Sequence, residues 1–264
     1  YIRNGLVNWL ALERLSRLAK PQNPDFDYDA LDYVKFGEDH DQLKTDLENN
    51  IPGILGVNND SHFVVAKGIS AEDVFTINDQ YNNFSDLSSY SNSFSSLGRF
   101  IPSNTDLSYI MLVVDEEINI SVKNSLGEEV GESFIQQPLE NEETPGDFSG
   151  EPLRMFYLPD PSSGNYDLEL SSNSNESYNL DVYYYDIDGN VNIDYFTGIV
   201  GPGNEDNYSL SFDKNNLGNS SSTQNVTFDS LINDIQALRS TGDINNFGVY
   251  MSLLAKAKIA KSLS

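Results

Sequence analysis

Two short apolar runs separated by a polar turn, within residues 61–79, constrain the fold of this chain more than any other feature. The first run, HFVVAKG, has the two-residue period of a β-strand, which puts His62 and Val64 on one face and Phe63 on the other. The second run, VFTI, consists of β-branched and aromatic residues, which favour strands. We therefore predict a β-hairpin that turns at residues 70–73.

The predicted hairpin brings chemically useful side chains together at its open end. His62 begins the first strand, and Asn78 and Asp79 end the second. A general base and the side chain that orients it must be neighbours in this way. We expect His62 to lie within direct or one-water hydrogen-bonding reach of Asp79 or Asn78. An ordinary strand histidine is the alternative interpretation. The other histidine, His40, lies in an acidic stretch and is expected to be solvated.

The motifs HFVVAKG and INDQ resemble the second half of a papain-like cysteine peptidase domain of the bacteriocin-processing type. Residues 52–57, PGILGV, are similar to the strand that precedes the histidine of that family. Residues 4–17 are similar to a helix between the family's cysteine helix and that strand. The resemblance covers about residues 1–100. It implies that His62 is the base and that Asp79 fixes its tautomer.

The reaction of that family is attack by a thiolate on a peptide carbonyl, and this chain has no cysteine. Gln80 also stands where the family has proline. We therefore predict that this chain alone hydrolyses no peptide, and that peptide is the substrate of the parent protein. The family packs its nucleophile helix on the sheet that carries the histidine. The face of His62, Val64 and Ala66 is therefore expected to be covered by a missing N-terminal segment or by another chain, with the hairpin over residues 228–263 as the less favoured alternative.

Charge divides the 264-residue chain into three blocks. Residues 1–105 carry a net charge of −7, residues 106–213 have 23 acidic and 2 basic side chains, and residues 214–264 carry +2. These blocks predict three structural units. The first, up to residue 105, is papain-like by the resemblance above, the second is an acidic β-sandwich over 106–214, and the third is a linker with a helical hairpin over 215–264. The total charge of −26 argues against a nucleic-acid partner. No apolar run reaches the roughly 18 residues of a membrane span.

The acidic block has the pattern of an all-β unit. Between residues 116 and 212, short segments alternate apolar and polar residues and are separated by glycine-rich and proline-rich turns, which predicts a sandwich. The sequences GEEVG, SGNYDLEL and DGN resemble a small sandwich domain that often follows such peptidase-like domains in bacterial surface proteins. That resemblance implies an extracellular or cell-surface location.

One turn of the acidic block is a candidate metal site. In DIDGN, the oxygens of Asp186, Asp188 and Asn190 alternate along the chain, and Gly189 allows the sharp bend that lets such oxygens converge on Ca²⁺. The alternative is a plain Asp-Gly hairpin turn. Divalent cations or high salt are expected to stabilise the acidic sandwich.

Helices are predicted at both ends of the chain. The first has an apolar stripe and ends before Pro21, and a second covers residues 40–49. An irregular connection is expected over residues 21–29, and a surface loop over residues 80–96. At the other end, two apolar stripes predict a helical hairpin that must dock on something. The residues of these two stripes are Phe228, Leu231, Ile232, Ile235 and Leu238, then Phe247, Tyr250, Leu253, Leu254 and Ala257.

The sequence therefore predicts an α+β fold with a partial papain-like domain, an antiparallel β-sandwich and a C-terminal helical hairpin. The expected function is that of a fragment of an extracellular or cell-surface bacterial protein with a cysteine-peptidase-like domain, inactive as this chain alone. The competing interpretation is a surface structural or binding protein that uses the peptidase-like fold as a scaffold. A third is a calcium-stabilised adhesion module.

Overall fold

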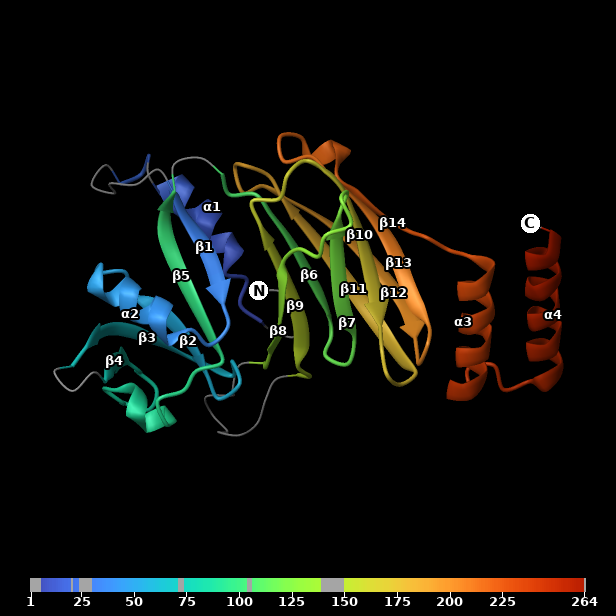
Figure 1. Cartoon of the computed structure of the whole chain (residues 1–264), viewed down its shortest axis with the longest axis horizontal. Helices are drawn as coiled ribbons and strands as arrows, with labels where there is room; N and C mark the ends of the chain where they lie inside the picture. Colours follow the sequence, from blue (N-terminus) through green and yellow to red (C-terminus); the bar gives the residue numbers. More distant parts are fainter. Residues whose placement is uncertain are drawn as a thin grey trace.

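The computed structural model describes residues 6–19, 21–23, 30–70, 74–103, 106–138 and 150–263 (Figure 1). In this part of the chain, three antiparallel sheets combine with N-terminal helices and a C-terminal helix pair in an α+β fold. Three predicted features lie outside the described residues: the hairpin tip at 71–73, the first two residues of the segment 4–17, and residues 24–29 of the acidic connection.

The N-terminal sheet contains the predicted hairpin. Its strand order is β1-β5-β2-β3-β4. The strands are β1 (Ala30–Phe36), β2 (Gly53–Val57), β3 (His62–Ile69), β4 (Phe75–Asn78) and β5 (Ser96–Ser103). Strand β3 pairs with β4 through Val65 opposite Asn78 and Ala66 opposite Ile77, which confirms the hairpin. Strand β1 was not predicted from the sequence, because its Asp32 and Lys35 interrupt the apolar pattern.

Helix α1 (Leu10–Ala19) lies along the outer edge of β1 (Figure 1). The carboxylate oxygen Oε1 of Glu13 accepts the Tyr33 N–H at 2.6 Å, and the Ser16 hydroxyl accepts the Leu31 N–H at 2.7 Å. A free sheet edge leaves such amides without partners. The polar side of α1 therefore completes the hydrogen bonding of β1.

The predicted apolar stripe lies only partly in the core, because Leu6 and Leu10 are buried and the later leucines of α1 are not. Leu10 and Glu13 are its buried residues. Leu12, Leu15 and Leu18 are 39%, 57% and 53% exposed. Because β1 needs acceptors and donors from α1, the helix turns its polar side inward and leaves these leucines outside.

Helix α2 (His40–Glu48) covers one face of the N-terminal sheet. It begins after Asp39, whose side chain accepts the Gln42 N–H and so caps the helix. Its Leu43 joins a buried cluster with Val64, Ala66, Ile77, Leu87 and Phe94. The last two come from the segment expected to be a surface loop, which includes a short 3-10 helix, Leu87–Tyr90.

This packing corrects the expectation that an outside segment covers the His62 face. Val64 and Ala66 are 1% and 0% exposed, and their cover comes from α2, Leu87 and Phe94 of the same chain. The serine-rich and asparagine-rich composition of residues 80–96 concealed two large apolar side chains that fold back onto the sheet. The cover of this face therefore lies within residues 1–105.

The acidic block forms two sheets that pack face to face. One has the order β14-β13-β10-β7 and the other β12-β11-β6-β9-β8. Their strands are β6 (Tyr109–Asp115), β7 (Asn119–Asn124), β8 (Glu132–Gln136), β9 (Leu153–Pro159), β10 (Gly164–Ser171), β11 (Glu176–Tyr185), β12 (Val191–Val200), β13 (Glu205–Phe212) and β14 (Ser221–Gln224). Leu112 of β6, Leu168 of β10 and Leu210 of β13 lie in their common core. Strand β14 lies in the predicted linker and pairs with β13, so the sheet continues beyond residue 214.

The N-terminal unit and the sandwich share a second core. Leu6, Leu10 and Tyr33 pack against Met111 and Val113 on the outer face of the β6 sheet. Because of this contact, the N-terminal sheet lies beside the sandwich along the long axis of the molecule (Figure 1). The two blocks are therefore packed together by buried apolar residues rather than joined only by a linker.

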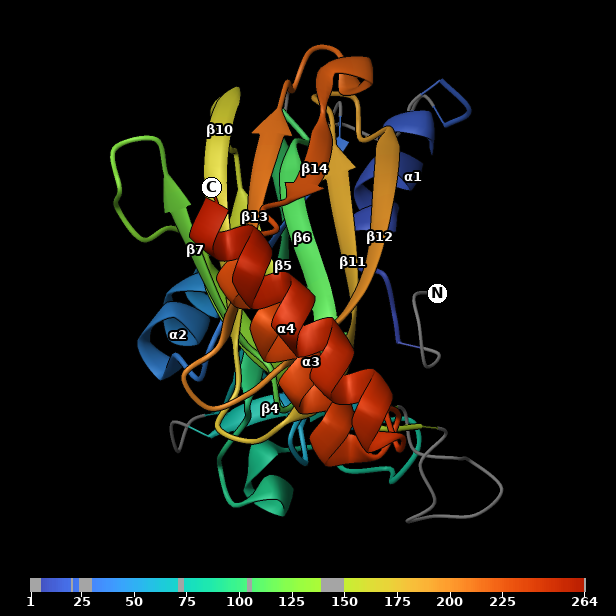
Figure 2. The ribbon, with the colours of Figure 1, turned by 90° about the vertical axis from the view of Figure 1, so that its right-hand side faces the viewer.

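The C-terminal segment forms the predicted helical hairpin of α3 (Phe228–Thr241) and α4 (Phe247–Leu263). Thr227 and Ser230 form a capping box at the start of α3. Ile232 and Ile235 of α3 pack against Leu254 of α4. Helix α3 lies nearer to the sandwich and α4 is outermost (Figure 2). None of the helices in the described ranges is long and apolar enough to cross a membrane.

Candidate functional site

His62 and Asp79 meet at the open end of the β3–β4 hairpin. The ring nitrogen Nε2 of His62 lies 3.0 Å from Oδ1 of Asp79. His62 begins β3 on the face of Val64, and Asp79 follows the last residue of β4. The predicted contact between these two side chains is therefore present, and it is direct.

Asn78, the other candidate for orienting His62, lies on the opposite face. It pairs with Val65, and cross-strand partners share one face of a sheet. Both Asn78 and Val65 are exposed. The strand alternation that brings Asp79 toward His62 necessarily turns Asn78 away from it. Of the two candidates, Asp79 alone contacts the ring.

A set of hydrogen bonds fixes the Asp79 carboxylate, which has no exposed side-chain surface. Its Oδ1 accepts the N–H groups of Tyr81 at 3.2 Å and Asn82 at 3.1 Å, in addition to His62. Its Oδ2 accepts the Tyr90 hydroxyl at 2.5 Å and the Asn82 side-chain amide at 3.3 Å. The carboxylate thus has partners on both oxygens, which holds its orientation.

These bonds also set the charge of Asp79. Burial alone acts to raise the pKa of Asp79, but the hydrogen bonds from Tyr90, Asn82 and His62 outweigh it and lower the pKa to about 2. Asp79 is therefore ionised at neutral pH and accepts hydrogen bonds only. The neutral His62 ring must then carry its hydrogen on Nε2, which leaves the lone pair of Nδ1 free.

The free nitrogen of His62 lies in a partly open, aromatic setting. The ring of His62 is flanked by Tyr81 and Tyr90, at centroid distances of 5.9 Å and 6.2 Å. The His62 side chain is 16% exposed. Among the residues that the structure describes, Nδ1 has no hydrogen-bond partner. The site therefore offers a partly exposed imidazole whose orientation is set through Nε2.

Sequence reasoning missed the residues that support Asp79. The Tyr81 N–H, two residues on, donates to the Asp79 side chain in an Asx-type turn that the sequence DQYN permits, and the Asn82 N–H donates to the same oxygen. Tyr90 carried no recognisable signal, because it lies eleven residues beyond Asp79 in a serine-rich stretch. Only the folded position of the loop brings its hydroxyl to the carboxylate.

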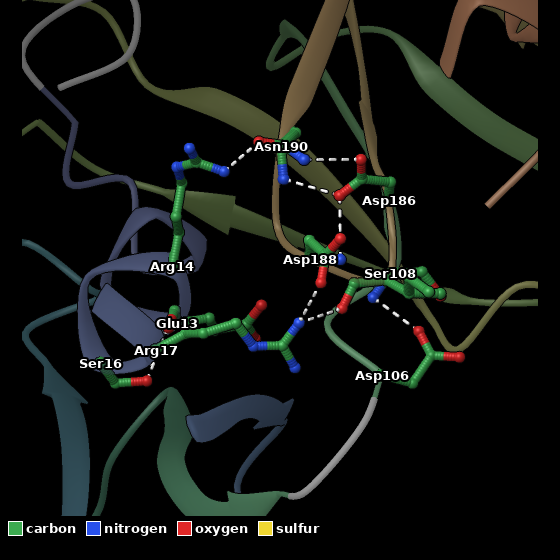
Figure 3. A network of polar contacts seen from close by, with 10 residues as sticks. Glu13, Arg14, Ser16, Arg17, Asp106, Ser108, Asp186, Asp188 and Asn190 are labelled. Atoms are coloured by element: carbon green, nitrogen blue, oxygen red, sulfur yellow. Dashed lines mark hydrogen bonds and ion pairs between the residues drawn. The ribbon is translucent and has the colours of Figure 1, made fainter. Parts of the chain in front are cut away.

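The DIDGN turn connects β11 to β12 and contacts α1 (Figure 3). Asp186 Oδ1 accepts the N–H groups of Asp188 at 2.9 Å and Asn190 at 2.8 Å, and Gly189 has a positive φ of 72°. Arg14 donates to the Asn190 side chain, and Arg17 forms an ion pair with Asp188 at 2.8 Å.

These contacts favour the hairpin-turn alternative for Asp186, Asp188 and Asn190 over the calcium loop. The oxygens of Asp186 already accept bonds from within the turn, and the other two side chains bind arginines. Within the described ranges, no group of three or more His, Cys, Asp or Glu side chains is placed to hold a metal ion. The turn attaches α1 to the sandwich.

We expect salt to stabilise the protein, because residues 106–213 have 23 acidic and 2 basic side chains. Raising the ionic strength from about 0.01 M to about 1 M shortens the Debye length from about 30 Å to about 3 Å and screens this repulsion. The melting temperature should rise in NaCl and in matched millimolar CaCl₂. If the melting temperature stays the same in both the NaCl and the CaCl₂ series, the expectation is wrong. A rise with Ca²⁺ alone instead points to Asp186, Asp188 and Asn190.

Replacing Asp79 by asparagine should remove an acid-sensitive contribution to stability. The pKa of Asp79 is about 2 in the protein against 3.8 ordinarily, so its contribution is present above pH 3.8 and is lost as the pH falls toward 2. That difference corresponds to about 2 kcal/mol of unfolding free energy. Urea unfolding at several pH values measures it. Asp167→Asn, at an exposed position of β10, is the control. If Asp79→Asn and Asp167→Asn lower the free energy of unfolding equally, the assignment of a lowered pKa to Asp79 is wrong.

No known protein family matches this sequence, and neither a curated protein nor a solved structure matches it.

Proposed function

We propose that the N-terminal unit is the base-bearing half of a papain-like cysteine peptidase site. The observation that carries the proposal is the contact between His62 Nε2 and the buried, ionised Asp79, which orients the imidazole. The resemblance of HFVVAKG and INDQ to that family supports the same roles. His62 is the general base, Asp79 orients it, and a peptide is the substrate.

The chemistry of such a site requires a thiolate that this chain lacks. In the proposed reaction, the thiol gives its proton to Nδ1 of His62, and the thiolate sulfur bonds to the peptide carbonyl carbon. The C–N bond then breaks as His62 gives the proton to the leaving nitrogen. Water, deprotonated by His62, finally breaks the C–S bond and restores the thiol. The nucleophile comes from a polypeptide outside the present sequence, and this chain alone is inactive.

The exposed side of α1 supports an outside partner. Leu12, Leu15 and Leu18 form an apolar stripe on a helix whose N-terminal neighbour, Trp9, packs edge-on against Phe63 at 5.3 Å. Phe63 is the residue next to His62. Its side chain points to the face of β3 opposite His62, so the stripe is a surface for a partner but does not itself place a nucleophile beside the base. The proposal carries with it the extracellular or cell-surface location that the sandwich resemblance implies.

The experiment begins with the gene. The reading frame is sequenced beyond both ends of the present chain, and the polypeptide that includes any cysteine found there is purified. Alkylation by iodoacetamide is then followed between about pH 4 and pH 9, because the thiolate is the reacting form. We expect alkylation well below the ordinary cysteine pKa of about 8.5, and a shift toward that value in His62→Ala. Peptide hydrolysis should be lost in the same variant.

His40→Ala is the matched control, because His40 is the other histidine of the chain and lies at the start of α2. It should leave both alkylation and hydrolysis unchanged. Absence of a cysteine from the whole reading frame, or a cysteine whose alkylation ignores His62, contradicts the proposal.

The second candidate function is that of a surface structural or binding protein with the peptidase-like fold as scaffold. Its support is the absence of cysteine together with the buried core that joins the N-terminal unit to the sandwich. A reading frame without a nucleophile favours this candidate. The calcium-stabilised variant of the idea additionally requires a melting temperature that rises with Ca²⁺ alone.

A further inference from the structure

The turn that precedes His62 has an uncommon backbone conformation. It joins β2 to β3, and Asn58, Asn59 and Asp60 have φ angles of 52°, 58° and 63°. Left-handed conformations are disfavoured for residues that have a Cβ atom, although Asn and Asp adopt them most readily. Three in succession persist only where the surrounding structure holds them. The contacts of this turn must therefore provide that support.

Asp60 provides the main contacts of the turn. Its Oδ2 lies 2.9 Å from Lys35 Nζ of β1, and its Oδ1 accepts the Ser96 hydroxyl of β5 at 2.6 Å. The Asp60 and Lys35 side chains are each 1% exposed. We call Asp60, Lys35 and Ser96 the buried clasp. It ties the turn to two other strands of the N-terminal sheet.

Gly56 of β2 makes room for the clasp. A Cβ atom at this position would lie 1.8 Å from Oδ1 of Asp60 and 2.7 Å from the Ser96 hydroxyl oxygen. Both distances are shorter than any real contact. The Asp60 carboxylate therefore lies against the β2 backbone, in space that any side chain at Gly56 would occupy.

Lys35 also connects the clasp to the sandwich. Its Nζ lies 4.9 Å from the ring centroid of Phe134 on β8 and 5.9 Å from that of Tyr157 on β9. Aromatic faces attract a cation at these distances. The turn before His62 is thus fixed with respect to both units of the protein.

We propose that the buried clasp positions His62, by holding the turn at Asn58–Asp60 in the one conformation that starts β3 with the imidazole toward Asp79. Only Ser61 separates Asp60 from His62, and Ser61 is itself tied to Asn58, whose carbonyl accepts the Ser61 hydroxyl at 2.7 Å. A change in the turn therefore rotates the start of β3. Buried ionic groups fix one register or conformation in some proteins, and that is the role assigned to the clasp here.

That this positioning serves catalysis rests on the proposed function. The contact between His62 and Asp79, however, is measured independently of any catalysis. The readout is the His62 ring in the present chain, which needs no nucleophile. Nitrogen-15 NMR reports which ring nitrogen carries the hydrogen, and the exchange rate of the Nε2–H with solvent reports how firmly Asp79 holds it. If the peptidase proposal is wrong, the NMR readout can still be made. Failure of the peptidase proposal and failure of the clasp proposal are therefore distinguishable.

The variants are Asp60→Asn, Lys35→Met and Ser96→Ala, of which the last removes one hydrogen bond and is the mildest. We expect the His62 Nε2–H to exchange at least roughly tenfold faster in Asp60→Asn and Lys35→Met, because the turn opens more often. Ser96→Ala should give a smaller change in the same direction. The fraction of the ring with its hydrogen on Nδ1 should rise in the same order.

Arg99→Met is the matched control. Arg99 of β5 forms an ion pair at 3.1 Å with Asp46 of α2, which is 2% exposed, in the same unit but away from the turn. This variant should lower the melting temperature and leave the His62 signals unchanged. If the clasp variants alter the His62 signals no more than Arg99→Met does, the clasp only stabilises the fold and the proposal is wrong. If Asp60→Asn does not fold, Ser96→Ala decides the question in the same way.

Discussion

Glu13→Gln is expected to stabilise the protein at neutral pH and to remove much of the pH dependence of its unfolding. Glu13 of α1 has no exposed surface, and its Oε1 accepts the Tyr33 N–H. Burial raises the pKa of Glu13 to about 10, and repulsion from Asp32 adds to this effect against the opposing Tyr33 bond. The side chain is therefore protonated in the folded protein at pH 7 and ionised in the unfolded chain.

The sign of the effect follows from this difference. A group whose pKa is raised on folding contributes its full stability below its ordinary pKa of 4.5 and loses it as the pH rises toward 10. By pH 7 the loss amounts to about 3 kcal/mol. Glutamine keeps the oxygen that accepts the Tyr33 N–H and has no proton to lose. Glu13→Gln should therefore match the wild type near pH 4 and exceed it by about 2 to 3 kcal/mol at pH 7.

Urea unfolding at several pH values measures this difference. Glu48→Gln, at an exposed position of α2, is the control and should change the free energy of unfolding little at any pH. A Glu13→Gln protein that is no more stable than the wild type at pH 7, or a difference that does not vary with pH, contradicts the assignment of a neutral, buried Glu13.

Lys35→Met is expected to give the largest loss of stability among single substitutions in the N-terminal sheet. The variant leaves the Asp60 carboxylate buried at 1% exposure without its cation. Breaking a buried ion pair by removing one partner typically costs 3 to 5 kcal/mol, or roughly 10 °C in melting temperature for a chain of this size. The double variant Lys35→Met with Asp60→Asn should lose less than the sum of the two single variants, because no charge is then buried alone.

Thermal unfolding followed by circular dichroism measures these variants. Lys67→Met is the control, because Lys67 is exposed on β3 of the same sheet. It should change the melting temperature by no more than a few degrees. If Lys35→Met and Lys67→Met have equal effects, or if the double variant loses the full sum, Lys35 and Asp60 are not coupled as the structure indicates.

The local patterns of the sequence were sufficient for much of the fold. The two-residue period of HFVVAKG and the strand residues VFTI predicted the hairpin and with it the contact of His62 and Asp79. Alternation and turn residues predicted the sandwich, and the spacing of apolar residues predicted α2 and the C-terminal helices. These signals are local, since each depends on residues close together in the chain.

The remaining features depend on contacts between distant residues. Strand β1 contains the buried Lys35. A lysine is expected to be exposed from the sequence alone, and only the folded structure shows Asp60 beside it. Helix α1 buries Glu13 and exposes Leu12, Leu15 and Leu18, because it binds the edge of β1. Strand β14 is made of serine, threonine and glutamine, and only its pairing with β13 identifies it. None of these residues carries a local signal for its tertiary role.

The candidate site shows the same division. Sequence spacing located His62 and Asp79 but gave Asn78 equal standing, and the strand register was needed to exclude it. The support of Asp79 by Tyr90 depends on how residues 80–96 fold back over the sheet. The burial of Leu87 and Phe94 decides that path, and their polar neighbours obscured it in the sequence.

The most direct test of the account is the position of the hydrogen on the His62 ring. Nitrogen-15 NMR at neutral pH, with His40 as internal reference, measures it in the wild type and in Asp79→Leu, which removes the acceptor oxygens. The account predicts that wild-type His62 carries its hydrogen on Nε2, that Asp79→Leu abolishes this preference, and that the His40 signals stay unchanged. A hydrogen fixed on Nδ1 of His62, or His62 signals that do not respond to Asp79→Leu, would contradict the central claim that Asp79 orients a base.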